Sequence, residues 1–530
     1  MASWHDEHYS VGAAVRSTPH SALACDPLMK FAPLRHTGLR VSLVALFALP
    51  GCGRTGLVEP PSFEGLDADA EDAVRPDDVR ADARDVTIGG DDANSPSEPV
   101  TTCFSDNDCI DAVCRLPFVG VSQGFCTVPC SEQTTCARGW SCRGIDPRDT
   151  ETVCVPPSLC VNLASDRVLQ TGPRTNAPSP THVLSLRLLQ QAVIEGGANE
   201  IVVGGFRDSG GTTLDAIRVD TSSLVATSSA AVLPRAVSEP RSLAITGSAP
   251  FRAFAWCGPE NRGVMLYNVF SNAFTDEQPL EDPPGKGCES PVSAGGYDGN
   301  FSIVYDITQA DGTPGLDVFY FLGGLEQSDR RGQVDLNTPP PHFPAIAMGE
   351  DDSTLLVWTE TVSQGGGFFS TIRGLLLGVD TAARLSVSNY ASQNARNQLV
   401  WDGQAFVAMA EAQFDAFGGS ALGVSRISEA GEILQGNDLA RSDVTGQLFD
   451  ASEVSSNHGD MLVGRTLLDS GNVGETEVAF QFATADGFYD DEFRIFGDRA
   501  RLTAARLSHV AIVQTPVALD LLVFSPVCAP

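Results

Sequence analysis

The sequence predicts a mainly β protein, because three features point away from helices and toward repeated sheets. Beyond Cys160 no long run of apolar residues has helical spacing, while short apolar alternations bounded by glycine occur throughout. A unit of two such strands recurs about every fifty residues. Ahead of this region, nine cysteines crowd into residues 103–160, which is typical of a small fold held together by disulfides.

The first element is a short apolar run from Val41 to Leu49, preceded by basic residues. It is too short to span a membrane, which takes about 20 apolar residues, but it has the layout of a secretory signal peptide. Residues 1–28 carry acids that suit such a signal poorly, so we expect translation to begin at Met29. Residues 1–51 are therefore predicted to be a leader and signal peptide.

The run ends in Leu49-Pro50-Gly51-Cys52, which resembles the lipobox of bacterial lipoproteins. The resemblance implies cleavage after Gly51, diacylglycerol on the thiol of Cys52 and an acyl chain such as palmitate on its new amine. Such an anchor would hold the protein to the cell envelope, and we expect the outer membrane, with either face open. An ordinary cleavage site without lipid is the alternative.

Residues 52–100 are predicted to be the anchor and a disordered acidic linker. Residues 57–100 contain thirteen acids, three arginines and one aromatic, Phe63. Such a composition cannot bury enough apolar surface to offset its chain entropy, and its charges repel one another. The whole chain carries a net charge of −33. This charge argues against nucleic acid as a partner and against attachment to anionic lipid by charge alone.

Residues 101–160 are predicted to form a duplicated disulfide module. Two groups of four cysteines have intervening gaps of five, four and eleven residues and of five, five and eleven residues. Each unit is expected to contain two disulfides, and four cysteines allow three pairings. Zinc is disfavoured because the module lacks a C-x2-C pair and histidine. The eight cysteines are Cys103, Cys109, Cys114, Cys126, Cys130, Cys136, Cys142 and Cys154.

The opening of the first unit, C-x-x-D-x-D-C, resembles the cysteine-rich units of predicted myxobacterial-type envelope lipoproteins and, more loosely, the Dickkopf N-terminal module. The resemblance implies an extracytoplasmic interaction or spacer unit without chemistry of its own. Asp106 and Asp108 could contact a calcium ion, but a turn of solvated acids is the favoured interpretation. No other cofactor is expected.

Four further cysteines lie outside these two units. Cys257 and Cys288 are expected to pair with each other. Cys160 stands where the large repeat region begins, and Cys528 stands near the end of the chain. We predict that these two also form a disulfide, which requires the two ends of the repeat region to lie close together.

Residues 161–530 are predicted to form a β-propeller. Seven copies of the two-strand unit are followed by a variable loop and a third strand, a pattern typical of propeller blades. Seven blades are expected, with six or eight as alternatives, and a pair of β-sandwiches is the competing fold. The strand "HVLSLRLL" is expected to complete the last blade, which removes a sheet edge. The second strands begin near Ile201, Phe251, Phe301, Thr354, Ala405, Asp460 and His509.

Acids and aromatics at matching positions suggest a candidate ligand or cation face. In propellers the loops after the second strands lie on the face where ligands usually bind, and five copies carry an acid there. Neighbouring aromatic rings could stack on sugars, although packing between blades uses such rings more often. The acids are Asp208, Glu260, Asp306, Glu360 and Glu411, and the aromatics are Trp256, Tyr305 and Trp358.

The sequence contains no motif that assigns a reaction. It lacks the G-x-S-x-G, H-E-x-x-H and phosphate-binding loop patterns. Its four histidines after the leader (His182, His342, His458 and His509) lack metal-ligand spacing. We therefore expect a non-enzymatic recognition or scaffold protein with an unknown protein or glycan partner. A hydrolase or lyase acting on glycans or esters, with Glu360 or Glu411 in its site, and an inert spacer are the alternatives.

Overall fold

The computed structural model describes residues 100–529 with internal gaps, and the signal peptide, Cys52 and acidic linker predictions lie outside the described residues. The described part belongs to one compact unit, residues 92–530. No helix in this part is long and apolar enough to cross a membrane. The gaps are 132–135, 149, 166, 209, 234–241, 248–249, 259–261, 276–277, 280–287, 289–291, 310, 322–329, 337–341, 351–352, 365–366, 378–381, 392–396, 414–419, 442–447, 469–475 and 485–486.

The described part of the cysteine module consists of short strands in one three-stranded sheet and in two-stranded hairpins. In the first unit β3 lies between β1 and β2, and in the second unit β4 pairs with β5. A further hairpin, β6 with β7, connects the module to the repeats. The elements are β1 (Thr102–Cys103), η1 (Asp106–Asp108), β2 (Val113–Arg115), β3 (Gly124–Thr127), β4 (Ser141–Gly144), β5 (Thr152–Val155), β6 (Leu159–Asn162), η2 (Leu163–Ser165) and β7 (Val168–Thr171).

The two units share one disulfide pattern, in which the first cysteine bonds to the third and the second to the fourth. The pairs are Cys103–Cys114, Cys109–Cys126, Cys130–Cys142 and Cys136–Cys154. This repetition supports the duplication inferred from the spacing. Cys257–Cys288 and Cys160–Cys528 also form disulfides, as the sequence predicted. Because disulfides persist in oxidising compartments, the protein is exported or extracellular.

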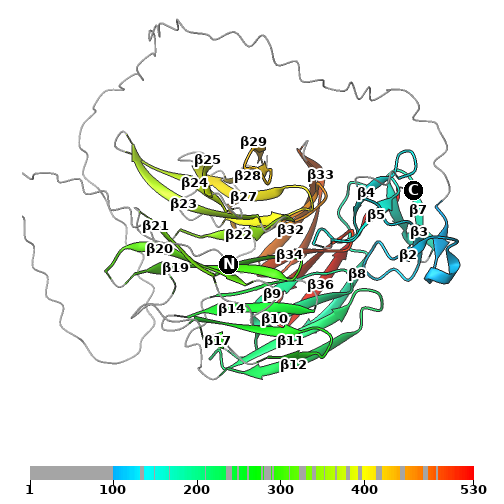
Figure 1. Ribbon diagram of the computed structural model, residues 1–530, viewed down its shortest axis with the longest axis horizontal. Helices are drawn as coiled ribbons and strands as arrows, with labels where there is room; N and C mark the ends of the chain where they lie inside the picture. Colours follow the sequence, from blue (N-terminus) through cyan, green and yellow to red (C-terminus); the bar gives the residue numbers. More distant parts are fainter. Residues whose placement is uncertain are drawn as a thin grey trace, which may run out of the picture. The chain divides into compact units, whose positions relative to one another are not determined.

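The described residues of the repeat region form seven antiparallel sheets, which we number as blades 1 to 7 (Figure 1). Blades 1 to 3 are β9 (Gln190–Glu195), β10 (Glu200–Phe206), β11 (Thr213–Asp220) and β12 (Ala226–Val232); β13 (Ser242–Thr246), β14 (Phe251–Cys257), β15 (Arg262–Asn268), β16 (Ala273–Phe274) and β17 (Gln278–Pro279); and β18 (Ser293–Tyr297), β19 (Asn300–Thr308), β20 (Pro314–Phe321) and β21 (Arg330–Asp335).

Blades 4 to 7 have the same four-strand order. They are β22 (Ala345–Met348), β23 (Thr354–Gln364), β24 (Gly367–Leu377) and β25 (Ala382–Ala391); β26 (Gln398–Trp401), β27 (Phe406–Gln413), β28 (Ser420–Ile427) and β29 (Ile433–Arg441); β30 (Leu448–Asn457), β31 (Asp460–Leu468), β32 (Glu477–Thr484) and β33 (Gly487–Phe496); and β34 (Arg499–Ala505), β35 (Ser508–Gln514), β36 (Ala518–Phe524) and β8 (His182–Arg187).

The blades form a closed ring, which identifies the fold as a β-propeller. The first strand of each blade contacts the first strand of the next, and β34 of blade 7 contacts β9 of blade 1. Strand β8 completes blade 7 by pairing antiparallel with β36, from His182 opposite Val523 to Arg187 opposite Ala518. In Figure 1 this appears as a cyan strand beside a red one. A pair of sandwiches would not give this cyclic order of sheets.

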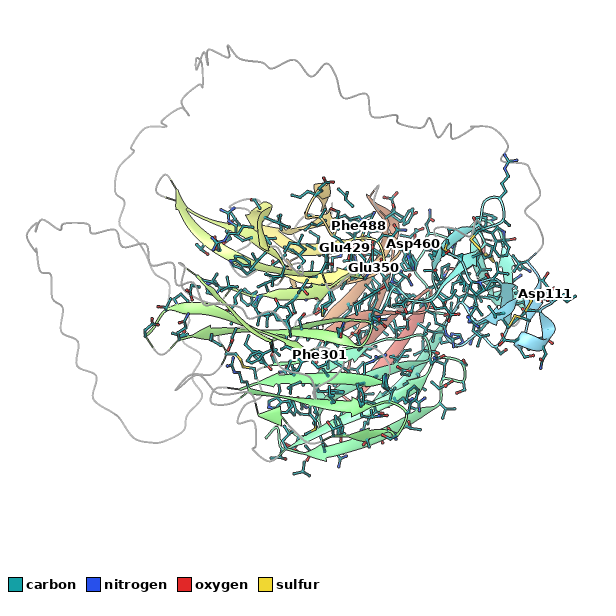
Figure 2. All side chains as sticks on the ribbon, viewed as in Figure 1. Asp111, Phe301, Glu350, Glu429, Asp460 and Phe488 are labelled. Atoms are coloured by element: carbon teal, nitrogen blue, oxygen red, sulfur yellow. A yellow bond between two sulfur atoms is a disulfide. The ribbon has the colours of Figure 1, made fainter. Side chains whose placement is uncertain are left out.

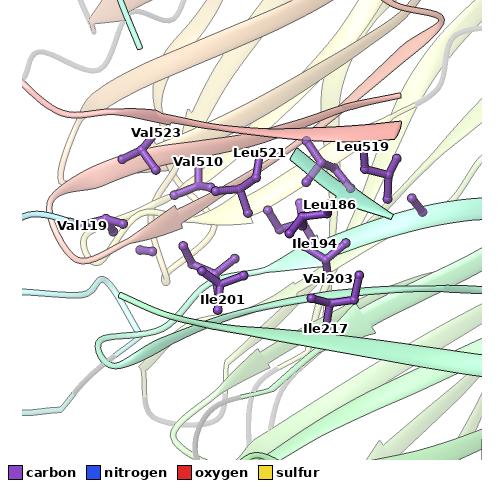
Figure 3. Packing of buried hydrophobic residues seen from close by; sticks show 14 of the residues in the cluster. Val119, Leu186, Ile194, Ile201, Val203, Ile217, Val510, Leu519, Leu521 and Val523 are labelled. Carbon is purple, nitrogen blue, oxygen red and sulfur yellow. The ribbon is translucent and has the colours of Figure 1, made fainter. Parts of the chain in front are cut away.

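The core lies between adjacent sheets, because each sheet buries both of its faces against its neighbours. The cluster at the junction of blades 7 and 1 unites β8, β35 and β36 with β9, β10 and β11 (Figure 3). Val119 of the cysteine module belongs to the same cluster and is fully buried. The module is therefore packed into the propeller core, so burial of apolar surface stabilises their contact.

Candidate functional site

The two ends of the blades define two faces of the propeller. In each antiparallel blade, the turns between first and second strands and between third and fourth strands lie at one end. The turns between second and third strands lie at the other end. We call the first end the module face and the second the loop face, because the cysteine module contacts turns of the first kind, as described next.

The module contacts the module face through backbone hydrogen bonds. Gly120 N–H donates to the carbonyl of Thr221 at 2.6 Å, and Leu507 N–H donates to that of Pro117 at 2.9 Å. The ring of His182 packs so closely on Gly120 that a Cβ at this position would lie 2.5 Å from it. Gly120 also has a φ of +73°, which favours glycine. The turn around Gly120 is thus shaped for this contact.

Arg506 in the turn between β34 and β35 links the module to two blade 1 turns. Its Nη1 donates to the carbonyl of Phe118 and its backbone N–H to Asp146 Oδ2, both at 3.2 Å. Its Nε and Nη2 donate to Ala198 O at 2.6 Å and Ser222 Oγ at 3.0 Å. Burial lowers the pKa of Arg506 to about 10, although nearby acids oppose this shift. The guanidinium therefore stays charged at neutral pH.

Arg148 extends from the module toward the centre of the ring. It forms ion pairs with Asp146 at 2.9 Å and with Glu195 of β9 at 2.5 Å, and it donates to the carbonyl of Ala504. Burial disfavours its charge, but the two carboxylates outweigh burial and raise the pKa of Arg148. Pro147 and Arg148 line a cavity of about 100 Å³ that is also bordered by several first strands. The module thus reaches the module-face end of the axial channel.

The first strands of all seven blades line a further cavity of about 170 Å³, which is the axial channel. An ion pair between Glu453 of β30 and Arg501 of β34 spans neighbouring strands there. Asn397 also borders the channel, but its amide donates to Phe343 O at 2.9 Å and to Thr359 Oγ1 at 3.0 Å. These polar side chains contact the protein itself, although Asn397 Oδ1 and Arg501 Nε are buried without a partner among the described atoms.

Two of the predicted face acids are engaged in local contacts. Asp208, at the end of β10, accepts hydrogen bonds from the backbone N–H of Thr212 at 3.1 Å and from its hydroxyl at 2.8 Å. These bonds lower the pKa of Asp208. Asp306 is fully buried in β19, where Oδ2 accepts from the backbone N–H of His342 and Oδ1 contacts the ring Nδ1, each at 2.8 Å. Asp306 thereby fixes the connection that leads to β22.

Of the other three predicted acids, the structure describes the side chain of Glu360 alone. Glu360 of β23 accepts from Trp358 Nε1 at 3.1 Å and contacts Arg373 Nε at 3.4 Å. Glu411 lies in β27 and its side chain is not described, while Glu260 lies outside the described residues. The described carboxylates are therefore each engaged within their own blade or the adjoining connection. They are not gathered around a common ligand position.

The three predicted aromatics are buried, and their rings pack sheets together. Trp256 lies in a cluster shared by blades 1 and 2, and Trp358 lies in one shared by blades 3 and 4. Tyr305 is fully buried, and its hydroxyl donates to Gly263 O of blade 2 at 3.2 Å. Buried rings cannot stack on a sugar, so the structure gives them the packing role and not the ligand role.

Metal-like clusters in the described residues are explained by the disulfides. The groups close enough to hold an ion are Cys103, Cys109 and Cys114, and Cys130, Cys136 and Cys142. All six sulfurs are in disulfides. Asp106 and Asp108 instead accept backbone hydrogen bonds, from Cys114 N–H at 2.7 Å and from Phe104 N–H at 2.7 Å. These two acids shape the first disulfide unit.

Comparisons with known proteins agree with the fold and go no further. No protein-family model and no curated protein matches the chain. Among solved structures, the propeller domain of the Trilobed protease from Pyrococcus furiosus is 8% identical, with 63% of this chain and 96% of that chain covered and a TM-score of 0.37. The WD40 domain of SCAP from fission yeast is 10% identical, with 65% and 98% covered and a TM-score of 0.33.

A third solved structure, the six-bladed propeller lectin of Aleuria aurantia, is 13% identical. The similarity covers 60% of this chain and 96% of that one, with a TM-score of 0.36. The chain is thus a β-propeller protein with a disulfide-rich module packed on one face.

Proposed function

We propose that this protein is a recognition or scaffold protein of the cell envelope that binds its partner, a protein or a glycan, through the loop face. The observation that carries this proposal is the position of the cysteine module. Backbone hydrogen bonds and the buried Val119 attach the module to the module face, so the module already covers turns of blades 7 and 1 there. The loop face is the end of the rigid ring that the module leaves for a partner.

The engagement of the predicted acids supports binding over catalysis. General acid–base catalysis needs carboxylates that can approach a substrate. Asp306 is instead buried against His342, and Glu360 is held by Trp358 and Arg373. A ring whose polar groups are used internally is a stiff platform, and stiffness lowers the ordering cost of binding.

Photo-crosslinking from the two faces tests this proposal. A photoreactive residue replaces Val517, which is 84% exposed in the turn between β35 and β36 on the loop face. The matched control replaces Val225, which is 59% exposed in the turn between β11 and β12 on the module face. We expect adducts in the producing cells from position 517 and not from position 225. Adducts from position 225 alone, or from neither position, would contradict the proposal.

We further propose that lipid on Cys52 attaches the protein to the outer membrane and that the acidic linker separates the propeller from the lipid surface. The support is the Leu-Pro-Gly-Cys pattern after an apolar run, together with disulfides that require export. Several acyl chains on one cysteine give durable anchoring, since each buried methylene contributes about 0.8 kcal/mol.

The intact mass of the protein extracted from membranes tests the anchor. We expect a chain that begins at Cys52 and carries the added mass of a diacylglycerol and one acyl chain. Replacement of Cys52 by serine should release the protein from the membrane fraction, because serine has no thiol to accept the thioether. A free thiol at Cys52, or an N-terminus elsewhere, would disprove lipidation.

A further inference from the structure

A third cavity, of about 80 Å³, lies where the cysteine module, the chain that follows it and blade 6 meet. We call it the seam cavity. One water molecule occupies about 10–15 Å³ when cavity volume is measured in this way, so the cavity has room for several waters or for one small polyatomic group. Residues from all three parts border it: Arg143 of β4, Arg174 and Asn176 of the connecting chain, and Asp460 and Tyr489 of blade 6. Figure 2 labels Asp460.

The charges around the seam cavity are unbalanced. Two guanidiniums, those of Arg143 and Arg174, share one carboxylate, that of Asp460. Arg174 Nη1 lies 3.2 Å from Asp460 Oδ2, and the Asp460 side chain is 51% exposed, so water weakens its effect. Burial and the charge of Arg174 lower the pKa of Arg143, while Asp460 opposes them. The two arginines therefore repel each other across a partly desolvated space.

Two buried hydrogen-bond donors of the residues that line the cavity also lack an acceptor in the described structure. The Nε atoms of Arg143 and Arg174 are both buried and have no hydrogen-bond partner among the described atoms. A buried N–H without an acceptor is destabilising, and more so when the group is charged. Asn176 and Tyr489 line the same cavity, and their side chains carry an amide and a hydroxyl, both of which are donor groups. Asn457 also lines the cavity, and its Oδ1 is a buried acceptor without a partner among the described atoms, so unpaired donors and positive charge outnumber the free acceptors there.

We propose that the seam cavity binds an oxyanion: a carboxylate, sulfate or phosphate group. Such groups accept several hydrogen bonds at once and pair with guanidinium in a planar, two-point geometry. A bound anion would satisfy the unpaired donors and separate the like charges of the two arginines. Cations are excluded as ligands by the same pair of arginines.

The site exists only while the module is docked, because Arg143 belongs to the module and Asp460 to blade 6. An anion that binds the docked arrangement more tightly than the undocked one must stabilise docking by the same factor. The seam cavity lies on the module face, so this inference does not depend on what the loop face binds. Anion occupancy would set how firmly the module is held.

Isothermal titration calorimetry of the full chain tests the site, with sodium sulfate, sodium phosphate and sodium acetate titrated separately at constant ionic strength in chloride buffer. We expect saturable binding of one anion per chain to at least one of the three. Acetate alone would indicate a carboxylate ligand, and sulfate or phosphate a tetrahedral one. The one-to-one stoichiometry distinguishes a site from the general stabilisation by sulfate through exclusion from the protein surface.

The Arg143→Gln variant should bind at least about tenfold more weakly, since a hydrogen bond to a charged group contributes about 1.5–3 kcal/mol. The matched control is Arg138→Gln, because Arg138 is an exposed arginine of the same module and should leave binding unchanged. If Arg143→Gln does not fold, Arg174→Gln makes the same test from the other side of the cavity. No saturable binding by any anion, or equal affinity in the arginine variant that folds, would overturn the proposal.

Discussion

Removal of the Cys160–Cys528 disulfide should destabilise the protein by up to about 6 kcal/mol. In the chain-entropy model, a disulfide stabilises by restricting the unfolded chain, and the effect grows with the logarithm of the closed loop. This disulfide closes a loop of 368 residues, whereas Cys257–Cys288 closes one of 31. The same model gives about 4 kcal/mol for the shorter loop. Loss of Cys160–Cys528 should therefore lower the free energy of unfolding by about 2 kcal/mol more than loss of Cys257–Cys288 does.

Chemical denaturation of two double alanine variants, C160A/C528A and C257A/C288A, measures this difference. Cys160, Cys257 and Cys288 are buried and Cys528 is half-buried, so both variants lose buried sulfur, and C257A/C288A loses slightly more of it. Backbone hydrogen bonds near the ring closure persist without the sulfurs, among them Val161 N–H to Pro526 O at 2.9 Å. A larger loss of stability in C257A/C288A than in C160A/C528A would contradict the prediction that Cys160–Cys528 stabilises the fold more strongly.

The strand positions of the propeller could be read from local sequence. The second strands begin at Glu200, Phe251, Asn300, Thr354, Phe406, Asp460 and Ser508, within one residue of the predicted starts. Six of these seven hairpin turns contain glycine, aspartate or asparagine between apolar alternations, and such residues favour a hairpin without reference to the rest of the chain; the turn of blade 7 is Arg506-Leu507. The Cys160–Cys528 disulfide was predicted by counting the cysteines of the sequence, which also needs no knowledge of tertiary contacts.

The role of the face residues could not be read in the same way. Trp256 and Tyr305 stand at the predicted strand positions, but whether a ring is exposed depends on the next blade, which pairing patterns do not describe. Asp306 likewise meets His342 from a connection 36 residues away. The sequence made Trp256, Tyr305 and Asp306 candidates for the ligand face. In the structure all three side chains are buried.

The contact region between the cysteine module and the propeller, which we call the seam, was not predicted from the sequence. Arg143, Arg148 and Arg506 are single arginines in short polar segments, and no local pattern distinguishes them from exposed ones. Their partners come from distant parts of the chain, as in the pair of Arg148 with Glu195. The one signal in the sequence is a strong excess of arginine over lysine, which fits the preference for guanidinium in buried ion pairs.

Acidification from pH 6.5 to pH 4.5 should destabilise the folded protein by about 4 kcal/mol through two buried histidines where the module meets the propeller. His458 Nε2 lies 3.1 Å from the carbonyl of Gly144 in the module and donates to it, while its Nδ1 is buried without a partner among the described atoms. Burial and the charge of Arg143 lower the pKa of His458 to about 4. Burial also lowers the pKa of His509, beside Ser455, to about 4.

The sign of the effect follows from proton uptake on unfolding. An unfolded histidine has a pKa of about 6.5, so between pH 4 and pH 6.5 the unfolded chain binds more protons than the folded one. Stability therefore falls as the pH is lowered through this window and is fully present above it. Each histidine contributes at most about 1.4 kcal/mol per pH unit, and less at pH 6.5, where the unfolded histidine is only half protonated. Two histidines therefore contribute about 4 kcal/mol between pH 6.5 and pH 4.5.

Urea denaturation at pH 7, 5.5 and 4.5 measures this loss for the native protein and for His458→Gln. The glutamine amide can still donate to the carbonyl of Gly144 but does not titrate, so the variant should lose about 2–3 kcal/mol less on acidification. Every other titrating group is common to the two proteins, so the difference in pH dependence isolates His458. Identical pH dependence in both proteins would show that the protonation of His458 does not control the stability of the seam.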